Sequence, residues 1–515
     1  MGKYVGIDLG TTYSVVAHID ENGIPHVIQN SEGFPLTPSA ILFGDDGAVV
    51  GDAAKSESFL EPSNYVALVK RHMGDRSFKY VASDGATYTP ESLSAIILKK
   101  LKYDAEKSLG DNIDGAVVTV PAYFNDSQRK ATLDAAQIAG LNVLAIINEP
   151  TAAALSYGID KGDETQKIIA IYDLGGGTFD ICLMKFQGTK IETLASMGNP
   201  QLGGCDFDNE IVNFVKEEAK KHGVDVESDS DAMQNLILDA EKTKKILSQK
   251  SKAKISLAVN GKRLAIEITR EDFERLIRPL VYRTIVLLED ALDRAGIARK
   301  DLNKILLVGG STRIPLVTSM ITEDTGITPS CDIHPDEAVA IGAAYHVIDV
   351  VKKRQVDGTI DIGNADVPEL KKEYKFIDRT AHSIGIIAYD ELGDKEYNSI
   401  ILKCNTPIPA QAEEVYKTIV DNQASLDLRV TQGESEELEY VSEIGAANIS
   451  LKVKPKGSPL RVAVICDADS IIHVRVIDEE DNEDLGEMRI DRINNLNKSE
   501  LEEQRFRVGK LNIGD

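Results

Sequence analysis

Short apolar runs alternate with segments of helical pattern along the first 348 residues of the chain. The apolar runs have the length of buried strands and lie at residues 4–7, 117–120, 168–172 and 305–308. The helical segments carry capping residues, apolar spacings of three and four, or alanine-rich composition, and they lie at residues 90–101, 125–139 and 336–345. This alternation predicts a layered α/β architecture.

The pattern changes near residue 350. Residues 349–379 are polar and contain glycines and a proline, which is typical of an interdomain linker. Strand-like runs separated by turn residues then predict an antiparallel β-sandwich over residues 380–490. We expect its strands at residues 383–388, 399–403, 415–420, 425–430, 448–453, 460–466 and 471–477. Residues 491–515 form a short charged tail.

Composition excludes several classes of function. The formal net charge of −25 argues against nonspecific binding of nucleic acid, which depends on lysine and arginine. The chain shows neither a signal-like start nor an apolar run of membrane length, so we expect a cytoplasmic protein without a membrane partner. The cysteines have no metal-site spacing and are expected to be small buried residues; they are Cys182, Cys205, Cys331, Cys404 and Cys466.

Two stretches share an unusual composition. Residues 8–12 (Asp-Leu-Gly-Thr-Thr) and residues 173–178 (Asp-Leu-Gly-Gly-Gly-Thr) each follow an apolar strand. Glycines let backbone N–H groups approach an anion, and the threonine hydroxyls add donors. A single stretch of this kind is usually an ordinary turn. Its repetition instead favours two hairpins that clamp one nucleoside polyphosphate, with the aspartates near its metal ion.

Motifs along the chain resemble those of the seventy-kilodalton heat-shock chaperones, the DnaK-like family. They lie at residues 5–12, 120–125 (Val-Pro-Ala-Tyr-Phe-Asn), 147–154 (Ile-Asn-Glu-Pro-Thr-Ala-Ala-Ala), 172–180 and 307–313 (Leu-Val-Gly-Gly-Ser-Thr-Arg). The resemblance extends from residue 1 to about 497. It implies an actin-like, two-lobed ATPase domain at residues 1–348, the linker at 349–379 and a peptide-binding β-sandwich at 380–490.

The resemblance implies catalytic roles for Lys70, Glu149, Asp173 and Thr178. Lys70 would reach the terminal phosphate and Glu149 would help to position the attacking water, since phosphoryl transfer depends on positioning and nearby positive charge. Asp8 and Asp173 would hold Mg²⁺ through water molecules. Without the resemblance, Lys70 reads as a surface lysine, Glu149 as a helix start and the aspartates as turn formers.

The same resemblance implies a set of nucleotide contacts from the two hairpins, a helix face and an adenosine loop. The set is Gly10, Thr11, Thr12, Tyr13, Gly175, Gly176, Gly177, Gly203, Gly204, Glu241, Lys244, Lys245, Ser248, Gly309, Gly310, Ser311, Arg313 and Asp336, with Asp180 assisting catalysis. The helix positions 241, 244, 245 and 248 fall on one face, which is also typical of a solvated surface with an ion pair. The expected cofactors are ATP or ADP and Mg²⁺, with K⁺ as a further candidate cation.

In the sandwich, the resemblance implies an apolar peptide groove. Its residues are Ile386, Tyr389, Tyr416, Ile419, Leu426 and Leu428, of which Tyr389 and Ile419 would form an arch over the groove. The alternative is an ordinary sandwich core, which uses the same residue types. Pro121, Arg129 and Asp378 match positions that pass the nucleotide state to the linker.

The chain departs from the family pattern at several places. Residues 495–501 resemble the first turn of the helical lid, and the rest of the lid is not expected, so bound peptide should leave quickly. The linker has Lys375 within residues 374–378, where the family has an unbroken leucine-rich run, which argues against ordinary coupling. Ala145 replaces an arginine that meets the J-domain co-chaperone, and Cys205 replaces an acid.

These observations favour an ATP-hydrolysing chaperone, expected to be a monomer, that binds extended apolar segments of unfolded proteins. A nucleotide exchange factor and a J-domain co-chaperone are its expected partners, the latter disfavoured by Ala145. The alternative is a nucleotide-regulated interaction protein that serves one partner and cycles ATP slowly or not at all. A metabolite kinase on the same ATPase fold fits less well, because the β-sandwich and Glu149 have no place in it.

Overall fold

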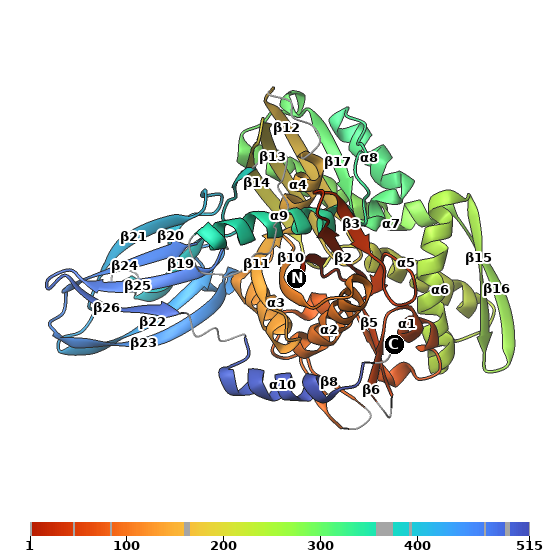
Figure 1. Cartoon of the computed structure of the whole chain (residues 1–515), viewed down its shortest axis with the longest axis horizontal. Coiled ribbons are helices and arrows are strands. Elements are labelled where there is room, and N and C mark those ends of the chain that lie inside the picture. The colour runs from red at the N-terminus through yellow and green to blue at the C-terminus, as the bar shows by residue number, and fades with distance from the viewer. Residues whose placement is uncertain are drawn as a thin grey trace.

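The computed structural model describes residues 3–44, 47–82, 85–158, 165–356, 374–390, 394–467, 470–489 and 495–513. Two mixed sheets lie at the centre of the N-terminal part (Figure 1). The first sheet has the strand order β11-β10-β1-β2-β3, with β4 paired to β2, and the second has the order β17-β12-β13-β14-β18. The bounds are β1 Lys3–Asp8, β2 Tyr13–Ile19, β3 Pro25–Ile28, β4 Thr37–Pro38, β10 Ile113–Val120, β11 Val143–Asn148, β12 Lys167–Leu174, β13 Phe179–Gln187, β14 Lys190–Asn199, β17 Lys304–Val308 and β18 Lys375–Ile377.

The two sheets share one plan around their first strands. β1 runs antiparallel to β2 and parallel to β10, and β12 likewise runs antiparallel to β13 and parallel to β17. A tight connection joins each antiparallel pair, after Asp8 in β1 and shortly after Asp173 in β12. The predicted pair of equivalent strand–turn–strand units is therefore confirmed.

Helices pack on both sheets and fill the space between them. α2 and α3 share an apolar core with the first sheet, α5 to α8 share one with the second, and α4 and α9 share a third with strands of both sheets. The helices are α1 Asp52–Glu57, α2 Pro90–Leu109, α3 Asp126–Ile138, α4 Glu149–Gly158, α5 Gly204–Lys221, α6 Ser230–Gln249, α7 Arg270–Ala295, α8 Pro315–Thr325 and α9 Ala338–Val356. The smaller strands are β5 Ala40–Gly44, β6 Gly47–Val50 and β7 Tyr65–Ala67 in one sheet, β8 Tyr80–Val81 with β9 Thr87–Tyr88, and β15 Lys252–Val259 with β16 Lys262–Thr269.

Local capping explains two of the predicted helix starts. The Thr89 hydroxyl accepts a hydrogen bond from Ser92 N at the start of α2, and Asn125 accepts one from Gln128 N at the start of α3. Each side chain satisfies a backbone donor that the first helical turn leaves unpaired. Both predicted helix starts are confirmed.

The backbones of β1, α4 and α9 pack closely against one another. A Cβ atom on Gly342 in α9 would lie 1.7 Å from Ala152 O in α4. A Cβ atom on Gly6 in β1 would lie 2.1 Å from Ala344 N in α9. Only glycine permits these approaches, so the packing of α9 against α4 and β1 depends on Gly342 and Gly6.

Two further sheets form the predicted antiparallel sandwich. Their strand orders are β20-β19-β22-β23 and β21-β24-β25-β26, and one apolar core contains residues of both. The bounds are β19 Ile384–Asp390, β20 Lys395–Leu402, β21 Ala410–Lys417, β22 Gln423–Gln432, β23 Ser442–Lys454, β24 Pro459–Cys466, β25 Ile472–Asp478 and β26 Glu483–Arg489. Every predicted run overlaps a strand, whereas β26 was missed because its sequence is polar.

Two expectations about segment ends were wrong. The helix expected at residues 336–345 begins later and continues to Val356, because Val347, Ile348 and Val351 keep one of its faces buried. Residues 349–356 of the expected linker are therefore helical, and residues 357–373 of it lie outside the described residues.

The charged tail contains α10 (Lys498–Lys510), which lies against α2 and α3 (Figure 1).

Among the helices of the described ranges, none is both long enough and apolar enough to cross a membrane.

We predict that Gly342→Ala lowers the free energy of unfolding of the N-terminal part by about 1–3 kcal/mol, because the added methyl group forces α4 and α9 apart. Calorimetric or urea unfolding measures this loss. Gly44→Ala is the matched control, since a Cβ atom there meets nothing within 4 Å. Equal stability of the two variants would contradict the proposed close packing.

Candidate functional site

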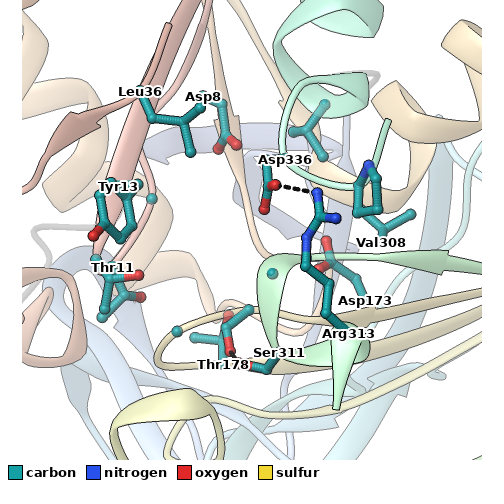
Figure 2. Close-up of a pocket in the computed structure, with 18 of the residues that line it drawn as sticks. Asp8, Thr11, Tyr13, Leu36, Asp173, Thr178, Val308, Ser311, Arg313 and Asp336 are labelled. Atoms are coloured by element: carbon teal, nitrogen blue, oxygen red, sulfur yellow. Dashed lines mark hydrogen bonds and ion pairs between the residues drawn. The ribbon is translucent and has the colours of Figure 1, made fainter. Parts of the chain in front are cut away.

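A cavity of about 650 Å³ opens between the two central sheets (Figure 2). This volume is typical of a site for a small molecule of nucleotide size. Most of the residues proposed from sequence line it: Asp8, Gly10, Thr11, Thr12, Tyr13, Lys70, Glu149, Asp173, Gly175, Gly176, Thr178, Glu241, Lys244, Lys245, Ser248, Gly309, Gly310, Ser311, Arg313 and Asp336. Positions far apart in the sequence therefore meet at one place, as the two-hairpin prediction requires.

The two glycine-rich connections touch each other at the bottom of this arrangement. A Cβ atom on Gly176 would lie 2.1 Å from Thr12 Oγ1, and one on Gly177 would lie 2.3 Å from Thr11 Cγ2. Threonines of the first connection thus occupy the space that side chains of the second would need. The two loops face one cavity as a pair.

Gly177, Gly203 and Gly204 are not among the residues that line the cavity. Gly203 precedes α5, and a Cβ atom on it would lie 2.5 Å from Gly177 N. Gly204 N donates to Gly175 O at 3.0 Å. Gly203 and Gly204 pack against the second hairpin at the start of α5, and the expected role of all three glycines as direct nucleotide contacts stays a prediction.

Buried carboxyl groups gather at the floor of the cavity. Burial, reinforced by the charge of Glu149, raises the pKa of Asp8 to about 7, although Thr119 Oγ1 donates a hydrogen bond to Asp8 at 2.9 Å. Burial also raises the pKa of Asp173 well above its usual range, and the charges of Glu149 and Asp180 act in the same direction. Burial raises the pKa of Asp180 to about 7. The site therefore holds more negative charge than its own cations offset.

This excess of buried carboxylate fits a divalent cation. Among the residues that the structure describes, no three His, Cys, Asp or Glu side chains converge closely enough to ligate a metal ion directly. Mg²⁺ in phosphate sites keeps several water molecules and uses only one or two carboxylates. Asp8 and Asp173, one from each hairpin, are suited to hold it in that way.

Lys70 lies within the same buried region. The 3₁₀ helix η2 (Val69–His72) carries it, and Lys70 Nζ donates to Glu149 Oε1 at 2.5 Å. Both side chains are almost fully buried. The next residue, Arg71, donates to Gly177 O and pairs with Asp206 at 2.5 Å. The helix η2 therefore also connects the second hairpin to the first half of the N-terminal part, which is the half that contains the first sheet.

The mouth of the cavity is crossed by a charged cluster. Lys55 in α1 pairs with Glu241 in α6, and Lys245 pairs with Glu241 at 2.8 Å. The hydroxyl of Tyr13 donates to Glu241 at 3.0 Å and accepts from Lys55 at 3.2 Å. Burial alone would raise the pKa of Glu241, but the two ammonium groups outweigh it and lower this pKa to about 2.

The opposite wall comes from the loop after β17. Gly309 has φ +81°, which turns the chain into the 3₁₀ helix η5 (Gly310–Arg313). Arg313 Nη2 donates to Asp336 Oδ2 at 2.6 Å, as the dashed line in Figure 2 marks. Ser311 Oγ donates to Gly175 O at 2.9 Å, so this loop is tied to the second hairpin. A planar guanidinium at this wall can stack on a purine ring.

Sequence reasoning missed several residues of the site. Asp208 lines the cavity and pairs with Lys244 at 2.8 Å, and Lys55 closes the mouth. Neither residue had a local signal beyond being one charge on a helix. Apolar residues of the wall were also missed, because their patterns indicate only core: Val15, Leu36, Val308, Ile314, Pro335 and Val339.

Hydrogen bonds join two of the three proposed coupling positions, Arg129 and Asp378, through Asn148. Asp378 accepts from Asn148 Nδ2 at 2.7 Å, and Asn148 Oδ1 accepts from Arg129 Nη2 at 2.6 Å. Arg129 also donates to Ala122 O, one residue after Pro121. The Arg129 side chain is buried.

The segment before the sandwich docks on the second sheet despite its atypical sequence. β18 pairs in parallel with β14, with Phe376 opposite Ile191. Arg379 then donates to Thr193 O in β14 at 2.6 Å and to Asn405 O in the sandwich at 2.8 Å. A single guanidinium therefore joins the two parts of the chain.

The proposed groove residues divide into two groups. Ile386 and Leu428 are buried in the sandwich core, and Tyr416 and Leu426 pack partly buried against it. Tyr389 and Ile419 are 42% and 45% exposed. The geometry thus favours a core role for Ile386 and Leu428. It leaves Tyr389 and Ile419 exposed at the surface, where they are available for contact.

The fold and the site define an α/β protein with a cavity between two glycine-rich hairpins, followed by a β-sandwich. A family model described as Hsp70 protein matches residues 4–510, nearly the whole chain. The chain therefore belongs to the Hsp70 family, whose members are in general nucleotide-dependent chaperones and ATPases that bind ATP or ADP with Mg²⁺.

We predict that acid weakens the contact between the sandwich and the N-terminal part through His382. Its Nε2 donates to Tyr123 O at 3.1 Å. Burial lowers the pKa of His382, as do the Arg129 and Arg294 charges, while the hydrogen bond to Tyr123 and the Glu434 charge oppose this shift. Docking therefore favours the neutral imidazole, is fully stabilised above the pKa of an exposed histidine, about 6.5, and weakens as the pH falls below it.

Small-angle scattering measures this effect as an increase in the radius of gyration between pH 7.5 and 5.5. His382→Leu should reduce the increase, and His222→Leu, at an exposed histidine, should leave it unchanged. Equal expansion of the His382 variant and the unmodified protein would show that another group is responsible.

Proposed function

We propose that this protein is an ATP-hydrolysing chaperone in which residues 1–348 bind and hydrolyse ATP and residues 380–490 bind extended apolar peptide. The observation that carries the proposal is the direct contact of two glycine–threonine hairpins below a cavity with buried carboxylates and a buried Lys70–Glu149 pair. Such a cavity suits a polyphosphate with a divalent cation better than an uncharged ligand.

The roles of the chain's residues follow from their places. Backbone N–H groups and hydroxyls of residues 10–13 and of Gly175, Gly176 and Thr178 bind the phosphates from two sides. Lys70 offsets charge on the terminal phosphate, and Glu149, held by Lys70, orients the attacking water. Asp8 and Asp173 hold Mg²⁺, which when bound neutralises charge on the phosphate oxygens. Thr178 and Asp180 complete the polar floor.

The adenosine part of the ligand fits between α6 and η5. Glu241, Lys244, Lys245 and Ser248 offer polar contacts to the ribose along one helix face. Arg313, fixed by Asp336, offers a flat surface to the base.

Nucleotide state would reach the peptide site through the bonds that join Arg129, Asn148 and Asp378. ATP can change peptide affinity only if it binds the docked and undocked arrangements differently. Asn148 directly precedes Glu149, so a change at the γ-phosphate has a short route to the linker.

A second candidate is a nucleotide-regulated protein that serves one partner and hardly cycles. The atypical linker favours it, because Lys375 interrupts the run that is leucine-rich in the family, which argues against ordinary coupling of the two parts. The measurements below separate the two candidates.

We predict that Glu149→Gln slows single-turnover ATP hydrolysis by about 100-fold or more, because the amide still accepts from Lys70 but no longer orients water as a carboxylate does. Binding of labelled ATP should persist. Glu217→Gln, at an exposed glutamate of α5, is the control and should hydrolyse at the normal rate. Unchanged hydrolysis in the Glu149 variant would remove this residue from the mechanism.

We predict that ATP accelerates release of a fluorescent leucine-rich heptapeptide by about tenfold or more, a typical coupling between linked sites. Asp378→Ala should abolish the acceleration without abolishing ATP binding, because it removes the acceptor for Asn148. Stopped-flow polarisation measures both rates. A rate of peptide release that does not change on addition of ATP, together with negligible hydrolysis, would favour the second candidate.

A further inference from the structure

The α10 segment, residues 495–513, is bound to the first half of the N-terminal part. Leu501 and Val508 of α10 are buried in the same apolar core as residues of α2, α3 and the first sheet. Asn497 caps the helix, with Glu500 completing a capping box. An amphipathic helix with its apolar residues buried in this core is part of the fold and not a solvated extension.

Polar contacts fix the position of α10 along its length. Arg76 donates to both carboxylate oxygens of Glu500, at 2.7 and 2.8 Å. Lys99 of α2 donates to Val508 O at 3.0 Å and to Leu511 O at 2.9 Å, at the C-terminal end of the helix. Charged groups therefore hold the N-terminal turn and the C-terminal end of the helix separately.

Beyond α10 the segment reaches β6. Ala48 N donates to Asn512 O at 2.9 Å, and Ala48 pairs in parallel with Ile513. A Cβ atom on Gly47 would lie 2.1 Å from Asn512 O, so the backbones are in direct contact. The segment thus links α2 and α3 to the small sheet β6-β5-β7.

This small sheet leads into α1, which carries a residue of the charged cluster at the cavity mouth. β6 leads through Gly51 into α1, which bears Lys55, the partner of Glu241 and Tyr13. Just after α1, Ser58 Oγ accepts from Gln234 Nε2 of α6 at 3.2 Å. Opening the cavity requires α1 to separate from α6.

We propose that the α10 segment is a brace that holds β6 and α1 against α6 and thereby slows release of bound nucleotide. The proposal rests on the nucleotide site proposed above. It adds that the α10 segment, from outside the cavity, determines how long nucleotide stays bound. A displaced α10 would free β6 from the body of the first half, and the Lys55–Glu241 contact would then break more often.

Charge reversal tests the brace. Glu500→Lys and Arg76→Glu each replace an attraction by a repulsion, and each should accelerate dissociation of a methylanthraniloyl-ADP·Mg²⁺ complex about three- to tenfold. The exchanged pair, Arg76→Glu with Glu500→Lys, should restore the slow rate. Glu502→Lys is the matched control, since Glu502 contacts only Arg505 of its own helix among the ion pairs of the described residues, and it should leave the rate unchanged.

Hydrogen exchange of the Ala48 amide and of α10 reports whether the segment has left. Val508→Asp places a carboxylate in the apolar contact and should displace α10 even where a charged pair does not. Faster exchange with faster ADP release supports the brace. Faster exchange with unchanged release overturns it, as does undiminished protection of α10 in the Val508 variant. Failure of every protein, including the unmodified one, to bind the ADP analogue would instead overturn the proposed nucleotide site.

Discussion

The contact between the two glycine-rich connections is the constraint on which the site depends. Thr11 and Thr12 occupy the space where side chains at positions 177 and 176 would lie, so the two sheets can meet only while those positions remain glycine. Gly203 must also remain glycine, because a Cβ atom on it would meet the backbone of Gly177 on the other side of the second hairpin. Because both hairpins end strands of buried sheets, this contact determines the separation of Asp8 and Asp173 and the shape of the cavity between them.

Electrostatics then determines what the cavity can accept. Asp173 and Asp180 are buried near the partly buried Asp8, and Lys70 is already paired with Glu149. Buried carboxylates without cations are costly, and the raised pKa values of these groups reflect that cost. A bound cation would lower it, whereas an anion alone would increase it. The polyphosphate and its metal ion are therefore expected to bind together, each making the other's site favourable.

The extent to which sequence predicted this structure follows from the range of each signal. The hairpins, the starts of α2 and α3, and the sandwich strands were predicted because their patterns are complete within a few residues, such as Asn125 with Gln128. Lys55, Asp208 and the α10 packing depend on partners far away in the chain, and no short pattern identifies them. The length of α9 was misjudged because charged residues 352–354 suggested a linker, whereas Val351 continues a buried face.

The two large contacts of the molecule differ in kind, and the difference bears on motion. The central sheets are joined through an apolar core that includes α4 and α9, and separating them would expose that core to water. The described contacts of the sandwich with the N-terminal part include the hydrogen bonds of Arg379 and His382, which water can replace. A polar interface of this kind costs little to open, as is usual between domains. The sandwich is therefore the part whose position a ligand in the cavity can change most easily.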